Sequence, residues 1–192
     1  LANQAMNYLS GGMVPKRLGN AHPNIVPYQV FETADGHLIL AIANDGQFKR
    51  FCGAAGLAHL SADPRYATNA TRVDHREELV ALLKPVLAAR GTSDWIATLE
   101  KANVPCGPIN RIDQVFADPQ AVARELTVPM THSQAGNLNL VASPLRLEKT
   151  PPEYRNAPPL LGEHTREILS QVLMLAPADI DALAKAGIAG VR

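Results

Sequence analysis

Residues 18–48 read LGNAHPNIVPYQVFETADGHLILAIANDGQF and contain two candidate strands joined by a turn. Residues 28–33 and 37–43 have the length and apolar content of strands. The Ala34-Asp35-Gly36 segment between them is typical of a hairpin turn in which Gly36 takes a positive φ. Because the second strand is nearly continuous in apolar residues, we expect it to be covered on both faces.

Polar residues flank this hairpin. Asn20 and His22 lie before it in a connector bracketed by prolines, and Asn44-Asp45-Gly46-Gln47 follow its second strand at the start of a helix. Loops and strand ends are where rigid scaffolds place chemistry. Free backbone amides at a helix start can bind an anion, and Asp45 can act as an acid or a base. In the alternative interpretation, Asp45 is only the helix N-cap and His22 is a hydrogen-bonded strut.

Helical periodicity and capping residues outline the rest of the chain. A helix over 71–90 has its apolar residues at helical spacing, and Thr92 or Ser93 is expected to cap the next helix, 93–103. A rigid turn at 104–109 leads into a short strand. The other predicted elements are helices at 1–10, 45–56, 113–119, 118–125, 162–175 and 176–189, and strands at 126–132, 137–143 and 145–149.

The arrangement of these elements predicts an α+β protein with a body between two stiff, Pro-rich connectors. A body of this kind is typical of a domain carried on another domain. We expect a helix of a larger domain at 1–12, a connector at 13–27, a small mixed α/β domain at 28–149, a second connector at 150–159, and helices that return to the larger domain at 160–192. The first helix has no capping residue before it, which predicts a fragment of a longer protein.

Composition narrows the possible functions. Lys+Arg and Asp+Glu number 18 each, so no basic surface is expected for nucleic acid. No apolar run reaches the length of a membrane span, and we expect no membrane association. Two isolated cysteines suit a reducing, cytoplasmic compartment, and the spacing of the six histidines favours no metal site. Cys106 is interpreted as a structural thiol and Glu163 as a helix-capping residue.

Six sequence segments taken together indicate a protein family more specifically than any one of them does. They are RLGNAHPNIVPYQVFETADG (17–36), NDGQF (44–48), DPRYATNATRVDHREEL (63–79), VPCGPIN (104–110), VFADPQ (115–120) and PPLLGEHTREIL (158–169). In this order and spacing the chain resembles the C-terminal half of class III coenzyme A transferases, a family that includes formyl-CoA, carnitine and succinyl-CoA:dicarboxylate CoA-transferases. The resemblance covers essentially the whole chain.

The resemblance implies a mechanism and a missing part. In this family a Rossmann-like large domain carries the coenzyme A site and an aspartate that attacks the acyl-CoA thioester, which gives a mixed anhydride and free thiolate. That aspartate precedes a helix similar to residues 1–9, so it is expected upstream of Leu1. We therefore expect no catalytic nucleophile in this chain and no activity from it alone. A coenzyme A thioester is expected as substrate rather than as a bound cofactor, a small carboxylic acid as the second substrate, and an interlocked homodimer as the full-length state.

The resemblance also assigns candidate positions in this chain. Asn20 and His22 correspond to a connector that holds a mobile glycine-rich loop over the active site in formyl-CoA transferases, although this chain has no glycine run there. Asp45 corresponds to an acidic proton-transfer residue of 2-methylacyl-CoA racemases. Here it is expected to orient an acceptor carboxylate or water, together with Asn44, Gly46 and Gln47. A racemase would carry Glu at position 45, which favours the transferase; a non-catalytic split subunit is the other alternative. The sequence of residues 20–29 (NAHPNIVPYQ) resembles the succinyl-CoA:dicarboxylate branch of the family more than the oxalate branch.

Overall fold

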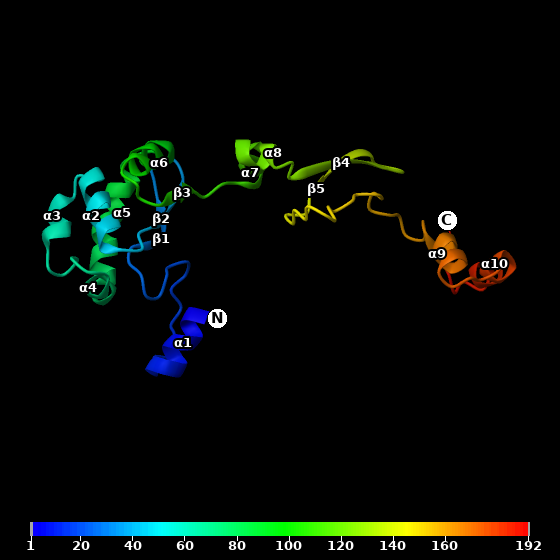
Figure 1. Ribbon diagram of the computed structural model, residues 1–192, viewed down its shortest axis with the longest axis horizontal. Helices are drawn as coiled ribbons and strands as arrows, with labels where there is room; N and C mark the ends of the chain where they lie inside the picture. The colour runs from blue at the N-terminus through cyan, green and yellow to red at the C-terminus, as the bar shows by residue number, and fades with distance from the viewer. Residues whose placement is uncertain (1, 192) are drawn as a thin grey trace. The chain divides into compact units, whose positions relative to one another are not determined.

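The computed structural model describes residues 2–191, which fall into two compact units that divide after Asn110 (Figure 1). In the first unit the helices are α1 (Ala2–Gly11), α2 (Asp45–Ala54), α3 (Ala58–Ala62), α4 (Asn69–Asp74), α5 (Arg76–Ala88) and α6 (Thr92–Lys101), and the strands are β1 (Tyr28–Glu32), β2 (His37–Ala41) and β3 (Cys106–Pro108). The second unit contains α7 (Ile112–Ala117), α8 (Pro119–Ala123), β4 (Thr127–His132), β5 (Gly136–Val141), α9 (Thr165–Gln171) and α10 (Pro177–Lys185). The fold is therefore mixed α/β with small antiparallel sheets.

The predicted hairpin forms the centre of the first unit. Strand order is β1-β2-β3, with antiparallel pairing on both sides of β2, and Leu40 lies opposite Gln29 on one side and Cys106 on the other. Leu38 and Leu40 are fully buried, whereas Ile39 is only partly buried. The prediction that β2 is covered on both faces is thus correct for one face and only partly correct for the other.

Helices cover the sheet on the side where its leucines point. The helix α5 packs on β1 and α6 packs on β3, and buried residues from both helices complete the core: Leu79, Leu83, Leu87, Trp95 and Leu99. The predicted helix 71–90 is in fact two helices, because His75 leaves helical geometry at φ −104°. The side chain of Thr68 caps the first of them, α4, by accepting a hydrogen bond from the Thr71 N–H.

The turn between β1 and β2 differs from the predicted turn in its backbone geometry, and its Asp35 side chain contacts the start of α6. Gly36 does not have a positive φ, so that prediction is wrong. Asp35 beside it accepts hydrogen bonds from the backbone N–H of Thr92 at 2.7 Å and from the Thr92 hydroxyl at 2.9 Å. The N-cap of α6 is Gly91, which lacks a side chain, and the predicted capping by Thr92 or Ser93 is also wrong. A carboxylate from a distant turn satisfies the helix start instead.

The second unit is built around the β4–β5 hairpin, in which Val128 pairs with Leu140. Asp118 caps α8 by accepting from the backbone N–H groups of Gln120 and Ala121, and the helix predicted at 118–125 forms over Pro119–Ala123. Residues 145–149, predicted as a strand, have no strand partner among the described residues. The predicted single domain 28–149 spans the division at Asn110 and stays a prediction.

Replacement of Asp35 by alanine is expected to lower stability in a pH-dependent way. The hydrogen bonds from Thr92 hold the pKa of Asp35 below its ordinary value. A carboxylate with a lowered folded pKa stabilises the protein above its unfolded pKa and stops doing so as pH falls through the folded value. Urea unfolding should therefore show a lower midpoint for Asp35→Ala at about pH 7 and a much smaller difference at about pH 2. Asp74→Ala is the control, and an equal loss in both variants would contradict the capping role.

Candidate functional site

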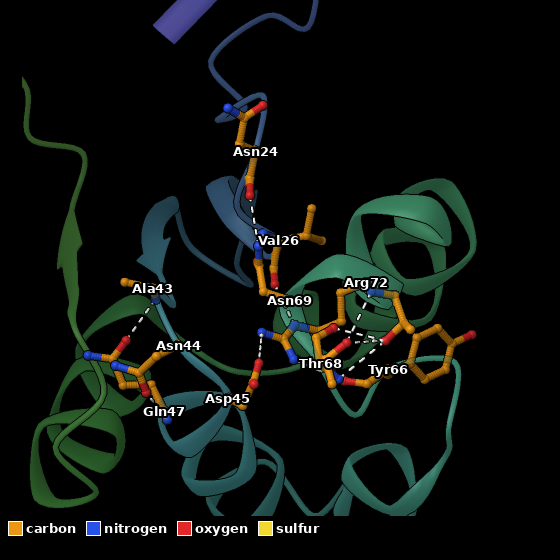
Figure 2. Close-up of polar contacts among 11 residues, drawn as sticks. Asn24, Val26, Ala43, Asn44, Asp45, Gln47, Tyr66, Thr68, Asn69 and Arg72 are labelled. Atoms are coloured by element: carbon orange, nitrogen blue, oxygen red, sulfur yellow. Dashed lines mark hydrogen bonds and ion pairs between the residues drawn. The ribbon is translucent and has the colours of Figure 1, made fainter. Parts of the chain in front are cut away.

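A buried arginine organises the end of β2. Arg72 is fully buried, and its guanidinium contacts three separate segments (Figure 2). Its Nε donates to the Val26 carbonyl at 2.7 Å, Nη1 to the Tyr66 carbonyl at 3.0 Å, and Nη2 to Asp45 Oδ1 at 2.9 Å. The group also lies over the Phe48 ring, 4.5 Å from its centroid. A buried charge is tolerated when it is both paired and hydrogen-bonded, and Arg72 meets both conditions.

The helix that carries Arg72 also holds the connector. Asn69, in the first turn of α4, donates to the Asn24 carbonyl at 2.8 Å and accepts from the Val26 N–H at 3.2 Å. Together with the Arg72 bond to the Val26 carbonyl, these contacts fix the connector just before β1 (Figure 2). The α4 helix thus determines where the connector enters the sheet.

The Asn44-Asp45-Gly46-Gln47 segment starts α2 with the side-chain amide oxygens of Asn44 and Gln47 already hydrogen-bonded. Asn44, not Asp45, is the N-cap: its Oδ1 accepts from the Gln47 N–H at 2.9 Å, and Gln47 Oε1 accepts from the Ala43 N–H at 2.7 Å. The N-cap interpretation of Asp45 is therefore wrong. Because both amide oxygens are used, the side-chain NH₂ groups of Asn44 and Gln47 remain available as donors. Asp45 keeps 53% of its side chain exposed while one oxygen pairs with Arg72.

Asn20 and His22 pair with the exposed edge of β1. Asn20 Oδ1 accepts from the Val30 N–H at 3.0 Å, and the His22 N–H donates to the Tyr28 carbonyl at 2.9 Å. The His22 ring stacks on Tyr28 at 5.4 Å, and its Nδ1 accepts from the Asn24 N–H at 3.1 Å. This geometry supports the interpretation of His22 as a hydrogen-bonded strut. Asn20 also lines a cleft of about 620 Å³ between β1 and α5.

The sequence candidates therefore form two groups that Arg72 connects. Asn44, Asp45, Gly46 and Gln47 are contiguous at the start of α2, and Asn20 and His22 lie along β1; Arg72 bonds to Asp45 and to the connector at Val26. Sequence reasoning did not single out Arg72, although it lies inside the 63–79 phrase. Arginine is usually exposed, and nothing local in the sequence marks this one as buried.

The remaining candidates have structural roles in this geometry. Burial raises the pKa of the Cys52 thiol to about 11 and also raises the pKa of the half-buried Cys106 thiol, so neither is favoured as a thiolate nucleophile. The interpretation of Glu163 as a helix-capping residue is wrong, because the N-cap of α9 is His164; Glu163 instead accepts from the Leu160 N–H at 2.6 Å, and this bond lowers its pKa. Within residues 2–191, His, Cys, Asp and Glu nowhere form a group of three or more placed to bind a metal ion. Every helix in the described part of the chain is too short or too polar to cross a membrane.

Comparison with known proteins identifies the class. The model of CoA-transferase family III matches residues 1–165, so the chain belongs to that family, and the resemblance drawn from its motifs is confirmed. The chain is 45% identical over 172 residues to succinate–glutarate CoA-transferase of Agrobacterium fabrum, covering 90% of this chain and 43% of the relative. It is 38% identical over 188 residues to human succinyl-CoA:glutarate CoA-transferase, covering 98% and 43%.

Solved structures agree with this assignment. A CAIB/BAIF family protein from Brucella suis superposes with a TM-score of 0.72 at 42% identity, over 90% of this chain and 44% of that one. The Rv3272 protein of Mycobacterium tuberculosis, at 24% identity and a TM-score of 0.67, shares the fold. This chain spans less than half the length of the curated relatives that it matches.

Loss of the Arg72 contacts is expected to destabilise the first unit. Arg72→Met leaves the carbonyls of Val26 and Tyr66 without their donors, and we expect a loss of about 3 kcal/mol in the free energy of unfolding. Asp45→Ala leaves the buried guanidinium without its counter-ion, and a smaller loss is expected. Asp74→Ala, on the same helix, should stay within about 0.5 kcal/mol. Chemical denaturation checks all three, and an unchanged Arg72→Met would contradict the assigned contacts.

The two thiols should react slowly in the folded protein. Because burial raises both pKa values, iodoacetamide at about pH 8 should modify Cys106 slowly and Cys52 more slowly still. Mass spectrometry after timed quenching measures both rates, and the urea-unfolded chain serves as the fully reactive control. Rapid modification of folded Cys52 would show that the thiol is not held in the core.

Proposed function

We propose that this chain forms the C-terminal part of an enzyme that transfers coenzyme A between an acyl-CoA and a small carboxylic acid. Membership of CoA-transferase family III supports this proposal, as do relatives named for succinate, glutarate, mesaconate and oxalate. The acceptor we favour is a dicarboxylic acid, because the relatives with the highest identities quoted above are named for glutarate. The enzyme would act in the cytoplasm as an interlocked homodimer, without a tightly bound cofactor.

The proposed chemistry is carboxylate exchange at an activated acyl carbon. An aspartate outside this chain attacks the thioester carbonyl; its C–O bond forms as the C–S bond breaks, and coenzyme A leaves as the thiolate. The thiolate then attacks the aspartyl carbonyl of the anhydride and releases the donor acid. The acceptor carboxylate displaces the thiolate from the aspartyl thioester, and the thiolate finally takes the acceptor acyl group. A large domain would bear that aspartate, and the helices at 1–12 and 160–192 would belong to it.

The single observation that carries a role for this chain is the Asp45–Arg72 pair. The pair places a half-exposed carboxylate just after β2. The buried Arg72 guanidinium fixes this carboxylate through the bond from Nη2 to Asp45 Oδ1 at 2.9 Å. The side-chain NH₂ groups of Asn44 and Gln47, in the same segment, have no hydrogen-bond partner among the described residues. We assign to this segment the orientation of the acceptor acid or of an ordered water. We also propose that the small domain and its connectors exclude water from the anhydride, and that Asn20 and His22 belong to the connector that does so.

The proposal is tested on the whole gene product. Succinyl-CoA with a panel of mono- and dicarboxylic acids should give a new CoA thioester, with the highest rate for a dicarboxylate of glutarate size. Hydroxylamine added during turnover should trap an acyl-aspartate as its hydroxamate. No transfer with any pair, together with exchange of the C2 hydrogen of a 2-methylacyl-CoA for deuterium, would identify a racemase instead.

The 192-residue chain by itself is expected to be inactive. It lacks the proposed nucleophile, so no CoA thioester should form from succinyl-CoA and glutarate at enzyme concentrations where the whole gene product, the positive control, converts all the donor. Liquid chromatography of the thioesters measures this directly. Turnover by the isolated chain would show that the nucleophile lies within it and would overturn the assignment.

A further inference from the structure

Arg72 forms hydrogen bonds to Asp45 at the start of α2 and to Val26 in the connector, and so links the two groups of candidate residues. We propose that Arg72 is a positioning residue: it fixes the Asp45 carboxylate and couples it to the connector that carries Asn20 and His22. The catalytic consequence rests on the proposed function, whereas the mechanical coupling does not. Arg72 would act through Asp45 and would not itself touch a substrate.

The coupling follows from the geometry of the guanidinium. Its Nε, Nη1 and Nη2 lie in one rigid plane and donate to the connector at Val26, to the turn at Tyr66 and to Asp45 (Figure 2). A planar fork cannot shift toward one partner without changing its bonds to the other two. Because the side chain is fully buried, water cannot replace a lost partner at low cost.

The ion pair is asymmetric, and that asymmetry favours a site rather than internal support alone. Arg72 has no exposed side-chain surface, whereas Asp45 has 53% of its side chain exposed. Among the described residues only Oδ1 of Asp45 has a partner, so Oδ2 is left for a ligand. Burial of the whole carboxylate beside Arg72 would add the cost of desolvating a second ion. The chain instead holds the carboxylate at the surface, in a fixed orientation.

The connector is the other end of the coupling. The Arg72 bond to the Val26 carbonyl and the Asn69 bond to the Val26 N–H hold this residue on both sides. Four residues earlier, the His22 N–H bonds to the Tyr28 carbonyl, and the histidine ring stacks on Tyr28. A loosened Val26 would therefore weaken the hold on the segment that positions His22 and Asn20 along β1, which Arg76 also holds through its Nη2 bond to the Pro23 carbonyl at 2.7 Å.

Hydrogen exchange tests the coupling without any assay of activity. In the whole gene product, Asp45→Asn keeps the size of the side chain and removes its charge. We expect the amides of His22 and Val26 to exchange on the order of 10-fold faster, and the amide of Trp95 in α6 to be unchanged. Asp74→Asn, on α4 and without a partner among the described residues, is the matched control. Unchanged exchange at His22 and Val26 in Asp45→Asn would overturn the proposed coupling.

Kinetics tests the positioning role. Asp45→Asn and Arg72→Met should each lower kcat/KM for the acceptor acid by roughly 10²-fold, and the double variant should lose little more, because both changes remove one unit. Guanidinium added to Arg72→Gly should restore part of the activity. If Arg72 were purely structural, the loss of kcat/KM in each variant would follow its unfolded fraction, and Asp45→Asn would keep its activity. The losses of the two single variants would then multiply in the double variant. A wild-type gene product that transfers no coenzyme A would refute the proposed function, and the exchange measurement would still decide the coupling.

Discussion

The first unit depends on one buried cation and the partners that make its burial possible. Desolvation of a guanidinium is costly, and the fold offsets that cost only when Val26, Tyr66 and Asp45 arrive together around Arg72. These residues come from the connector, from the turn before α4 and from the start of α2. A contact that needs three distant segments at once selects a single arrangement of them, because a partial arrangement leaves a buried charge unpaired. The connector, α2 and α4 are therefore specified jointly.

This requirement gives a physical reason for the polar residues on either side of the central hairpin. The side-chain oxygens of Asn44 and Gln47 accept from backbone N–H groups, their NH₂ groups have no partner among the described residues, and the Asp45 carboxylate is half exposed. Asn20 and His22 cover part of the β1 edge. In both places local hydrogen bonds determine which polar atoms remain free.

The sequence was informative where the determinants are local. The hairpin and the helices predicted at 45–56 and 118–125 follow from turn chemistry and periodicity, and the structure contains each, the helices over Asp45–Ala54 and Pro119–Ala123. The predictions that were wrong concern residues whose structure depends on contacts with distant parts of the chain. Asp35 caps a helix 57 residues away, which no pattern near residue 92 reveals. The burial of Arg72 depends likewise on partners outside α4. The ordered phrases identified the family, while the roles of Asn20, His22, Asn44, Asp45, Gly46 and Gln47 stay predictions.

The order of the strands has a consequence for synthesis on the ribosome. The central strand β2 obtains its second neighbour only from residues 106–108, after α2 to α6 have been made. Until then an apolar strand has one unpaired edge, which is a template for association with other chains. Nascent chains that end before Cys106 should therefore depend on chaperones, and the short β3 strand protects that edge once it has formed.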